Sequence, residues 1–413
     1  MSISQQEGAT MTAEPVSRYP FDRTEALRPP QEWAQLQGGC PVAHVQLPSG
    51  DTAELVTRYD DVRTLLTDPR FSRGGAGAAR VSTTADGGIF ARGMASGSMI
   101  AGTGHRRWRR LLTPSFTIRK IEGWRPRVQR MADELVDGML AGGSPANLSR
   151  ELGLPLPVRV ICALVGAPSE DQDKFAHWSQ VMLTLTRYEQ SEVEKAYEEF
   201  GAYVSDLVDD KRAAPGDDML SELTQISDSQ DGRLSHEELI ATVQALLLAG
   251  HETTSNMIGI MVAMLLSEPE PYAAVVEDPE LIPGTVEEVL RLDTTLSVIG
   301  MPRVATEEAD FGGVKVGAGT TLIPCRPAAN RDPRKFPDPD HFDARRDNAG
   351  QHLAFGAGPH FCLGQPLARM ELQVVLGTLA RRLPGLGLRD APGDLRLRTG
   401  LLSGGLQDVW VTW

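Results

Sequence analysis

The sequence predicts a mainly helical protein with small β-sheets, and three observations support this prediction. Residues 235–268 carry one long apolar helical pattern, and several shorter segments between 103 and 213 have apolar residues at three- and four-residue spacing. Two other segments, 42–56 and 301–323, alternate apolar and polar residues between turn-forming glycines and prolines, as short strands do. We therefore expect helices to form the body of the molecule, with small sheets at one side.

The N-terminal part of the chain is expected to alternate between loops and short elements. Residues 1–20 are polar and predict a flexible tail, followed by a single domain over 21–413. Residues 42–56 predict a hairpin, because a Pro-Ser-Gly-Asp turn breaks their alternation, and 59–66 predict a short helix. The segment 71–102 holds eight glycines among large apolar residues, which favours a functional lid over a linker.

The long helix is the strongest element of the pattern. It begins after Ser235, since Ser235 and Glu238 form a capping box, and it ends near Glu268. Roughly 32 residues at 1.5 Å each span about 48 Å. A helix of that length that is apolar around most of its circumference must cross the middle of the molecule. Further helices are expected near residues 104–113, 121–141, 151–166, 169–186, 190–213, 281–293 and 364–382.

Composition and charge exclude several classes of protein. Lys plus Arg is 41 and Asp plus Glu is 55, so the net charge of −14 argues against nucleic acid as a partner. No stretch approaches the roughly 18 apolar residues of a membrane span, and the polar N-terminus lacks the apolar core of a signal peptide. The four cysteines are scattered without a C-x-x-C pair, which argues against a zinc site or a disulfide framework. We expect a soluble, cytoplasmic enzyme without membrane or nucleic-acid partners.

A glycine-rich turn just before a predicted helix carries a single cysteine, Cys362, in the sequence FGAGPHFCLG. Backbone amides in such a turn, and the start of the next helix, can point at the sulfur and stabilise a thiolate. A lone thiolate with no second soft ligand nearby suits one axial position on a heme iron. The alternative is a buried structural cysteine in a glycine loop.

This segment resembles the heme-binding loop of the cytochrome P-450 monooxygenases, F-x-x-G-x-[HR]-x-C-x-G. Phe355, Gly358, His360, Cys362 and Gly364 all fall in register. The resemblance covers nearly the whole chain from about residue 20. It implies the fold of that family, a triangular helical prism with the long helix over the heme. It also implies a heme b cofactor (iron protoporphyrin IX) with Cys362 as its metal ligand and with Phe355 and Gly364 in contact with it.

The middle of the long helix reads AGHETT, which is weakly helix-forming, since a mid-helix glycine costs roughly 1 kcal/mol relative to alanine. Ala249 and Gly250 leave space for a ligand, and Thr253 could turn its hydroxyl from the i−4 carbonyl toward that space. The match is to the [AG]-G-x-[DE]-T-T motif of the same family. By resemblance, Ala249 and Gly250 contact the cofactor, while Glu252 and Thr253 are the catalytic acid and alcohol that deliver protons during dioxygen activation. The alternative is that the small residues only permit close helix packing. His251 is expected to make a local hydrogen bond rather than to bind iron.

A third match supports the fold. Glu288 and Arg291 lie three residues apart on one helix face and resemble the E-x-x-R ion pair of the family. The usual third member is an arginine in a later P-x-R-F segment, but here that segment reads PDHF and has His341 in the arginine position. The partner that completes the structural ion pair is therefore left open.

Four cationic residues match the positions that hold the two heme propionates in the family: His105, Arg109, Arg303 and His360. Carboxylates removed from water need cationic or hydrogen-bonding partners. His105 and Arg109 are four residues apart and share a helix face. A basic surface helix is the alternative for residues 105–110.

The resemblance implies a monooxygenase that inserts one atom of dioxygen into a bulky organic substrate, by hydroxylation or epoxidation, in secondary metabolism such as antibiotic biosynthesis. We expect the substrate to contact Ala245, Ala249, Ile299 and Leu402, together with part of 71–102. The main alternative is a heme-thiolate catalyst of oxidative coupling or ring closure without oxygen insertion. A peroxygenase and a non-enzymatic heme-thiolate carrier or gas sensor are less consistent with an intact Glu252-Thr253 pair.

The electrons are expected to come from other proteins, because no G-x-G-x-x-G sequence opens a βαβ unit. The family resemblance implies a ferredoxin and a ferredoxin reductase. The segment 105–120 contains six arginines and lysines and no acidic residue, so we expect it to attract an acidic donor.

Overall fold

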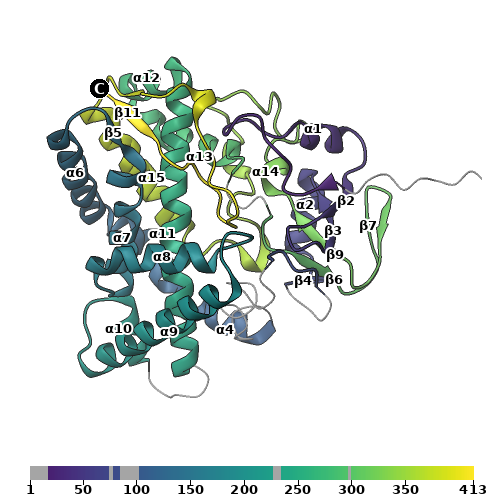
Figure 1. The fold of residues 1–413 in the computed structure, drawn as a ribbon, viewed down its shortest axis with the longest axis horizontal. Coiled ribbons are helices and arrows are strands. Elements are labelled where there is room, and N and C mark those ends of the chain that lie inside the picture. Colours follow the sequence, from purple (N-terminus) through teal and green to yellow (C-terminus); the bar gives the residue numbers. More distant parts are fainter. Residues whose placement is uncertain (1–16, 74–77, 84–101, 227–233, 296–298) are drawn as a thin grey trace, which may run out of the picture.

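The structure is a computed structural model and describes residues 17–73, 78–83, 102–226, 234–295 and 299–413. Most of the helices fill one side of the molecule, with the long helix α11 running through them, and the strands β2, β3, β4, β6 and β9 lie on the other side near α1 and α2 (Figure 1). The predicted class, mainly α with small sheets, is confirmed.

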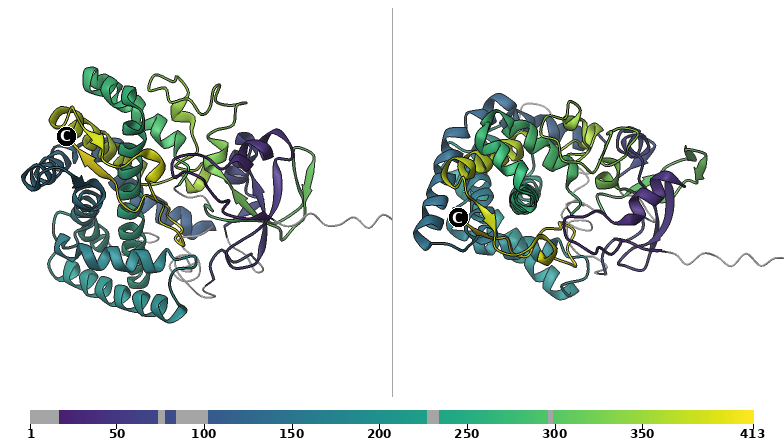
Figure 2. Two further views of the ribbon diagram at one scale, coloured as in Figure 1. Left: turned by 45° about the horizontal axis from the view of Figure 1, so that its top comes forward. Right: turned by 90° about the horizontal axis from the view of Figure 1, so that it is seen from above.

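Helix α11 spans His236–Ser267, a run of 32 residues, and begins as the capping box predicts. The Glu238 amide donates to Ser235 Oγ at 3.1 Å, and the Ser235 amide donates to Glu238 Oε2 at 2.8 Å. The helix packs against α7 (Pro155–Val165), α9 (Gln190–Ala213) and α15 (Gln365–Arg382). Seen end-on, it lies among the other helices (Figure 2, right). Because its side chains are buried on most sides, it crosses the core as predicted.

The remaining helices follow the predicted order with shifted ends. Helix α7 begins four residues later than expected, because a π-helical turn over Ser149–Gly153 precedes it. The spacing did not predict α1, α10, α12 or α14. The helices not yet given bounds are α1 (Gln31–Gly38), α2 (Tyr59–Thr67), α4 (Gly102–Leu112), α5 (Ile118–Glu122), α6 (Arg125–Gly142), α8 (Gln172–Met182), α10 (Met219–Gln225), α12 (Pro269–Glu277), α13 (Ile282–Leu292) and α14 (Arg326–Ala329).

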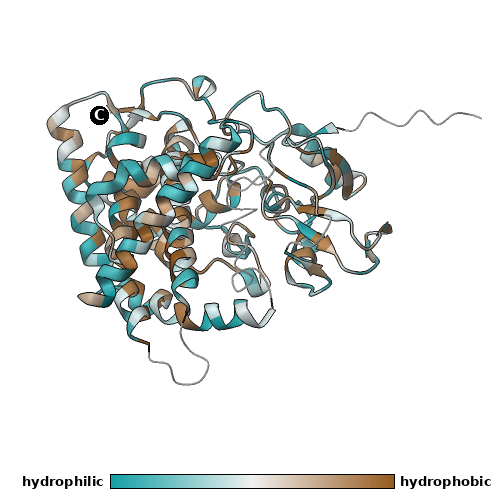
Figure 3. Ribbon diagram, turned by 60° about the horizontal axis from the view of Figure 1, so that its bottom comes forward, coloured by the Kyte–Doolittle hydropathy of each residue, from teal (hydrophilic) through white to brown (hydrophobic). Residues whose placement is uncertain are grey.

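The strands form three sheets. The largest has the order β1-β2-β3-β9-β6-β4, in which β2 and β3 form the predicted hairpin and β3 pairs with β9 in parallel. Its strands are β1 (Ser17–Arg18), β2 (Val42–Gln46), β3 (Thr52–Val56), β4 (Phe71–Ser72), β6 (Arg303–Ala305) and β9 (Thr321–Pro324). The others are the pair β7 (Ala309–Phe311) and β8 (Val314–Val316), and the sheet of β10 (Gly387–Leu388), β11 (Trp410–Thr412) and β5 (Ala146–Asn147). Hydrophobic residues concentrate on the inner helices and hydrophilic residues on the outer turns (Figure 3).

Two expectations about the N-terminal half change. The prediction of a flexible tail over residues 1–20 is wrong at its C-terminal end, because β1 pairs with β2. Tyr19 is also buried, and its hydroxyl donates to Cys325 Sγ at 3.4 Å. Residues 1–16 lie outside the described part of the chain. So does most of the glycine-rich segment 71–102, and the lid therefore stays a prediction.

The ion pair between Glu288 and Arg291 is completed by a residue that the motif did not identify. Arg291 donates from Nε and Nη2 to the two oxygens of Glu288, each at 2.7 Å, and both side chains are fully buried. The third member is Arg346, whose Nε donates to Glu288 Oε1 at 2.9 Å. His341 contributes only its backbone carbonyl, which accepts from Arg291 and Arg346. The loop that carries Arg346 lies so close to α13 that a Cβ at Gly284 would overlap the carbonyl oxygen of Ala344. Glycine at position 284 therefore permits this approach.

We predict that Arg346→Ala destabilises the protein by about 1–3 kcal/mol, because it removes a donor from a buried carboxylate. Arg345→Ala is the matched control. Arg345 is 70% exposed and pairs with Asp278 at 3.1 Å, so its loss should change stability by about 0.5 kcal/mol or less. The measurement is the free energy of unfolding in urea, and equal values for the two variants would contradict the assignment of Arg346.

Candidate active site

A cavity of about 360 Å³ joins the two strongest motifs of the sequence. One part of its lining comes from the middle of α11, including Ala245, Ala249, Gly250 and Thr253. Another part comes from the loop before α15, which carries Cys362. The structure thus brings the AGHETT segment and the cysteine loop to one site. The predicted cofactor contacts His105, Arg109, Phe355, His360 and Gly364 line the same cavity, whereas Arg303 does not.

The conformation of the loop before α15 depends on one backbone hydrogen bond and on two glycines. The Cys362 amide donates to the Phe355 carbonyl at 2.9 Å. Gly356 and Gly358 have φ values of +74° and +70°, in the region that L side chains rarely adopt. At Gly358 a Cβ would also lie 2.8 Å from the Leu66 carbonyl oxygen of α2. These constraints fix where the loop carries its cysteine.

Cations and a backbone amide surround the Cys362 sulfur. Burial raises the pKa of the Cys362 thiol, while the Gly364 amide and the guanidinium groups of Arg326, Arg109 and Arg369 act to lower it. These neighbours favour a thiolate over a thiol once a cation binds the sulfur. The expectation that amides near the start of the helix face the sulfur therefore agrees with the structure at Gly364.

Four arginines gather at this site: Arg73, Arg109, Arg303 and Arg326. Burial and the other three arginines lower the pKa of Arg73 to about 9, and burial and Arg326 lower the pKa of Arg303 to about 10. Among the described residues, Arg73 Nε and Arg303 Nη2 have no hydrogen-bond partner. Enclosed positive charge that lacks partners requires anions.

Two histidines lie beside these arginines. The rings of His105 and His360 have centroids 4.2 Å apart. Burial, together with Arg73, His105 and other cations, lowers the pKa of His360 to about 3, and burial and Arg109 lower that of His105. Burial and the neighbouring cations therefore favour the neutral imidazole at both residues, and each neutral imidazole can donate one N–H.

The donor set fits a heme. The unpartnered guanidinium atoms and the neutral imidazoles suit two propionate carboxylates, and Cys362 suits the iron. Arg73 and Arg326 were not expected from the sequence. Arg73 follows β4 without a recognisable motif. Arg326 carries one signal, since it is a lone charge in the otherwise apolar stretch from Thr321 to Ala329.

The polar residues in the middle of α11 bond within the helix. Thr253 Oγ1 donates to the Ala249 carbonyl at 2.7 Å, so its hydroxyl lies on the i−4 carbonyl while the residue lines the cavity. His251 Nδ1 donates to the Leu247 carbonyl at 2.6 Å, and His251 is not among the described residues that line the cavity. A Cβ at Gly250 would lie 2.6 Å from Ile161 Cγ1, so this glycine also permits the close packing of α7 on α11.

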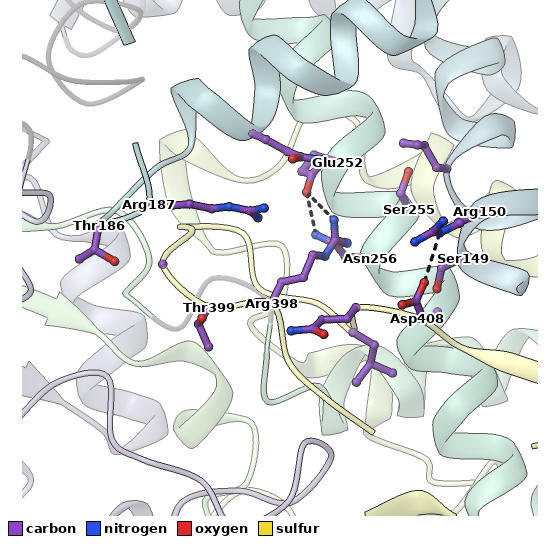
Figure 4. A pocket seen from close by; sticks show the side chains of 16 residues that line it. Ser149, Arg150, Thr186, Arg187, Glu252, Ser255, Asn256, Arg398, Thr399 and Asp408 are labelled. Carbon is purple, nitrogen blue, oxygen red and sulfur yellow. Dashed lines mark hydrogen bonds and ion pairs between the residues drawn. The ribbon is translucent and has the colours of Figure 1, made fainter. Parts of the chain in front are cut away.

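The expected substrate contacts fall into two pockets. Ala245 and Ala249 line the cavity with Cys362. Ile299 and Leu402 line a separate pocket of about 530 Å³, between the segment 20–26 and the C-terminal segment 395–404. Glu252 lines neither of these; it lines a third pocket together with Arg398 (Figure 4).

The described residues contain no cluster of three His, Cys, Asp or Glu side chains that could hold a metal ion. No helix in the described ranges is long and apolar enough to cross a membrane.

Comparisons with known proteins agree with this site. A sequence model described as Cytochrome P450 matches residues 158–383. The chain is 41% identical, over 98% of its length and 100% of the relative, to the mycinamicin IV hydroxylase/epoxidase of Micromonospora griseorubida. The solved structure of the LnmA cytochrome P450 hydroxylase of Streptomyces atroolivaceus matches with a TM-score of 0.87 and 39% identity, over 96% of this chain and 100% of that one. SgvP, described as a candidate thioether synthase in the tailoring of griseoviridin, matches with a TM-score of 0.90 and 36% identity, over 97% and 100%. The chain therefore belongs to the cytochrome P450 family, whose members are heme-thiolate monooxygenases.

Proposed function

We propose that this monooxygenase uses heme b and a ferredoxin to insert one atom of dioxygen into a bulky organic metabolite, by hydroxylation or epoxidation, in antibiotic biosynthesis. The observation that carries the proposal is that one cavity is lined by Cys362, by Thr253 and by the donors Arg73, Arg109, Arg326, His105 and His360. When bound, the heme supplies the electron-transfer and oxygen-activating chemistry that side chains lack.

The chain's own residues hold the cofactor and handle protons. Cys362 is the metal ligand, and Arg326 and the Gly364 amide stabilise its negative charge. Arg73, Arg109, Arg303, His105 and His360 bind the propionates. Phe355, Ala249 and Gly250 contact the ring. Thr253 presents a hydroxyl inside the cavity, and Glu252 precedes it in the chain as the acid that resupplies its proton.

The substrate is proposed to lie against α11 beside Thr253. Ala245 and Ala249 are small, so the α11 wall leaves room for a large molecule. The named activities of the similar proteins, a mycinamicin IV hydroxylase/epoxidase and the LnmA hydroxylase, support a secondary metabolite as substrate. A screen of such metabolites, read as a shift of the heme absorption band, tests this class. Binding confined to small fatty acids would contradict it.

Oxidative coupling without oxygen insertion is the second candidate, and the similarity to SgvP favours it. The two reactions differ in the fate of dioxygen. Turnover under ¹⁸O₂ labels the product of a monooxygenase, whereas a coupled or ring-closed product gains no ¹⁸O and loses two hydrogens.

The electron donor is proposed to dock over α4, α5 and the exposed ring of Phe361. Arg106 and Arg119 are exposed here, and so is the side chain of Ile118. Two other cations of the segment are engaged elsewhere: Arg107 pairs with Glu238, and Lys120 pairs with Glu222 at 2.7 Å. The basic segment is therefore less charged than its sequence suggests, and Arg106 and Arg119 are the better probes.

Replacing Cys362 with serine should abolish the strongly red-shifted absorption band of the reduced carbon monoxide complex, because an alcohol is a poor substitute for the thiolate. The spectrum of the purified variant, compared with that of Cys362→His at equal heme content, measures this. A retained red-shifted band in Cys362→Ser would show that another residue supplies the sulfur.

Replacing Thr253 with alanine should leave heme binding intact and divert electrons from product to peroxide or water. We expect product per NAD(P)H to fall on the order of tenfold, since positioned proton transfer contributes that much or more. Thr253→Ser keeps the hydroxyl and is expected to keep most of the coupling. If Thr253→Ala matches the native enzyme in a reconstituted system, Thr253 has no part in proton delivery.

Reversing the charge at Arg119 should slow reduction by ferredoxin at low salt and have little effect at high salt. The Debye length falls from about 30 Å at 0.01 M to about 3 Å at 1 M, so only the low-salt rate depends on surface charge. Lys195→Glu is the control, because this substitution makes the same change in net charge on a different helix, α9. The measurement is the stopped-flow rate of reduction by ferredoxin. Equal effects of the two substitutions on this rate would show that the donor docks on another surface.

A further inference from the structure

Residues of helix α11 line two pockets that differ in the polarity of their walls. Thr253 lines the cavity that holds Cys362, whereas Glu252, the adjacent residue, lines a different pocket of about 740 Å³. Figure 4 shows this second pocket with Glu252 and Arg398. Most of the residues that line this second pocket are polar: Ser149, Arg150, Gln180, Thr186, Arg187, Glu252, Ser255, Asn256, Arg398, Thr399, Gln407 and Asp408. The two members of the proposed proton-delivery pair thus face different compartments.

The carboxylate of Glu252 is held by a residue from the far C-terminal part of the chain. Arg398 Nη1 lies 3.5 Å from Glu252 Oε1, and Asn256 Nδ2 donates to the same oxygen at 3.4 Å. Arg398 Nη2 also donates to Asn256 Oδ1, and Asn256 Nδ2 donates to Ser403 Oγ at 3.0 Å. Glu252 is 3% exposed, so these contacts replace the water that a carboxylate otherwise requires.

The segment that carries Arg398 is fixed in place. Its backbone forms a bridge between Leu397 and Leu406, and the Arg398 amide donates to the Gly405 carbonyl at 2.8 Å. A Cβ at Gly405 would lie 2.6 Å from Asn256 Cγ, so glycine is what lets this hairpin approach α11. Because these contacts hold the hairpin against α11, the guanidinium of Arg398 lies beside the Glu252 carboxylate.

The pocket also offers polar atoms that the described residues leave without partners. Ser255 is 8% exposed and its Oγ has no hydrogen-bond partner, and neither does Arg398 Nε. Buried polar atoms of this kind are normally satisfied by ordered water when the space is roomy and polar. The pocket therefore suits water rather than an apolar ligand.

We propose that Arg398 is a positioning residue for Glu252, whose carboxylate it holds at the wall of a polar pocket distinct from the cavity that contains Cys362. This inference rests on the proposed function, in which Glu252 resupplies the Thr253 hydroxyl. Arg398 touches neither heme nor substrate in this role. It acts only through the carboxylate that it holds.

The first test measures position without turnover. The heme-loaded enzyme is treated with a carbodiimide and glycinamide, and amide formation at Glu252 is quantified by peptide mass spectrometry. Arg398→Ala should raise labelling of Glu252 several-fold, because the carboxylate loses its cationic partner and gains access to the reagent. Arg398→Lys should restore most of the native protection. Arg150→Ala is the control, because Arg150 lines the same pocket but pairs with Asp408 at 3.3 Å. Native labelling of Glu252 in Arg398→Ala would overturn the proposal.

The second test asks whether this position matters for coupling. Arg398→Ala should lower product per NAD(P)H and raise peroxide, with native heme content and with the Kd of a metabolite from the absorption screen unchanged within about twofold. The loss should disappear when Arg398→Ala is made in a Glu252→Gln background, because the two residues act as a unit. A loss of equal size in that background would overturn the proposal.

The two tests separate this inference from the function on which it rests. If Glu252→Gln alone leaves coupling native, the role of Glu252 in proton delivery fails, and the positioning of Glu252 by Arg398 then has no part in coupling, whatever the labelling shows. If Glu252→Gln uncouples the enzyme and Arg398→Ala does not, Glu252 keeps its role and the positioning role of Arg398 is wrong.

Discussion

The burial of α11 is the constraint on which the rest of the structure depends. A helix of 32 residues that is packed against α7, α9 and α15 has little contact with bulk water, so most polar side chains at its centre bond to neighbouring groups of the protein. His251 and Thr253 donate to carbonyls one turn earlier in the helix, and Glu252 is held by Asn256 and Arg398. The same packing that forms the core therefore sets the positions of the catalytic groups, and it places consecutive residues in separate pockets.

Two buried charge clusters show how structural charge differs from charge that serves a cofactor. Around Glu288, a carboxylate accepts from Arg291 and Arg346, and backbone carbonyls take most of the remaining guanidinium donors. Such a network is complete in itself. Around Arg73 and Arg303, cations face one another and leave donor atoms without partners. The second arrangement is unfavourable unless anions bind beside these arginines, and the heme carboxylates are such anions.

The chain is acidic overall, yet its heme side is basic. A net charge of −14 coexists with a cation cluster beside Cys362 and with exposed arginines on α4 and α5. Because surface charges are screened over about 10 Å at 0.1 M salt, a partner that docks there responds to the local charge more than to the net charge. Pairing of Arg107 and Lys120 with acidic residues weakens this local field, which the sequence of 105–120 does not reveal.

The sequence by itself determined the helical class, the ends of α11, the β2–β3 hairpin and the loop around Cys362. These depend on neighbouring residues: a capping box, a turn, alternation, and glycines with fixed spacing. It did not identify Arg73, Arg326, Arg346 or Arg398, and it assigned to His341 a contact that Arg346 makes. Only the tertiary structure decided these, because a guanidinium at the end of a long, flexible side chain finds its partner on a distant segment. It also decided that Ile299 and Leu402 line a different pocket from Ala245, since no local pattern records which chain segments meet.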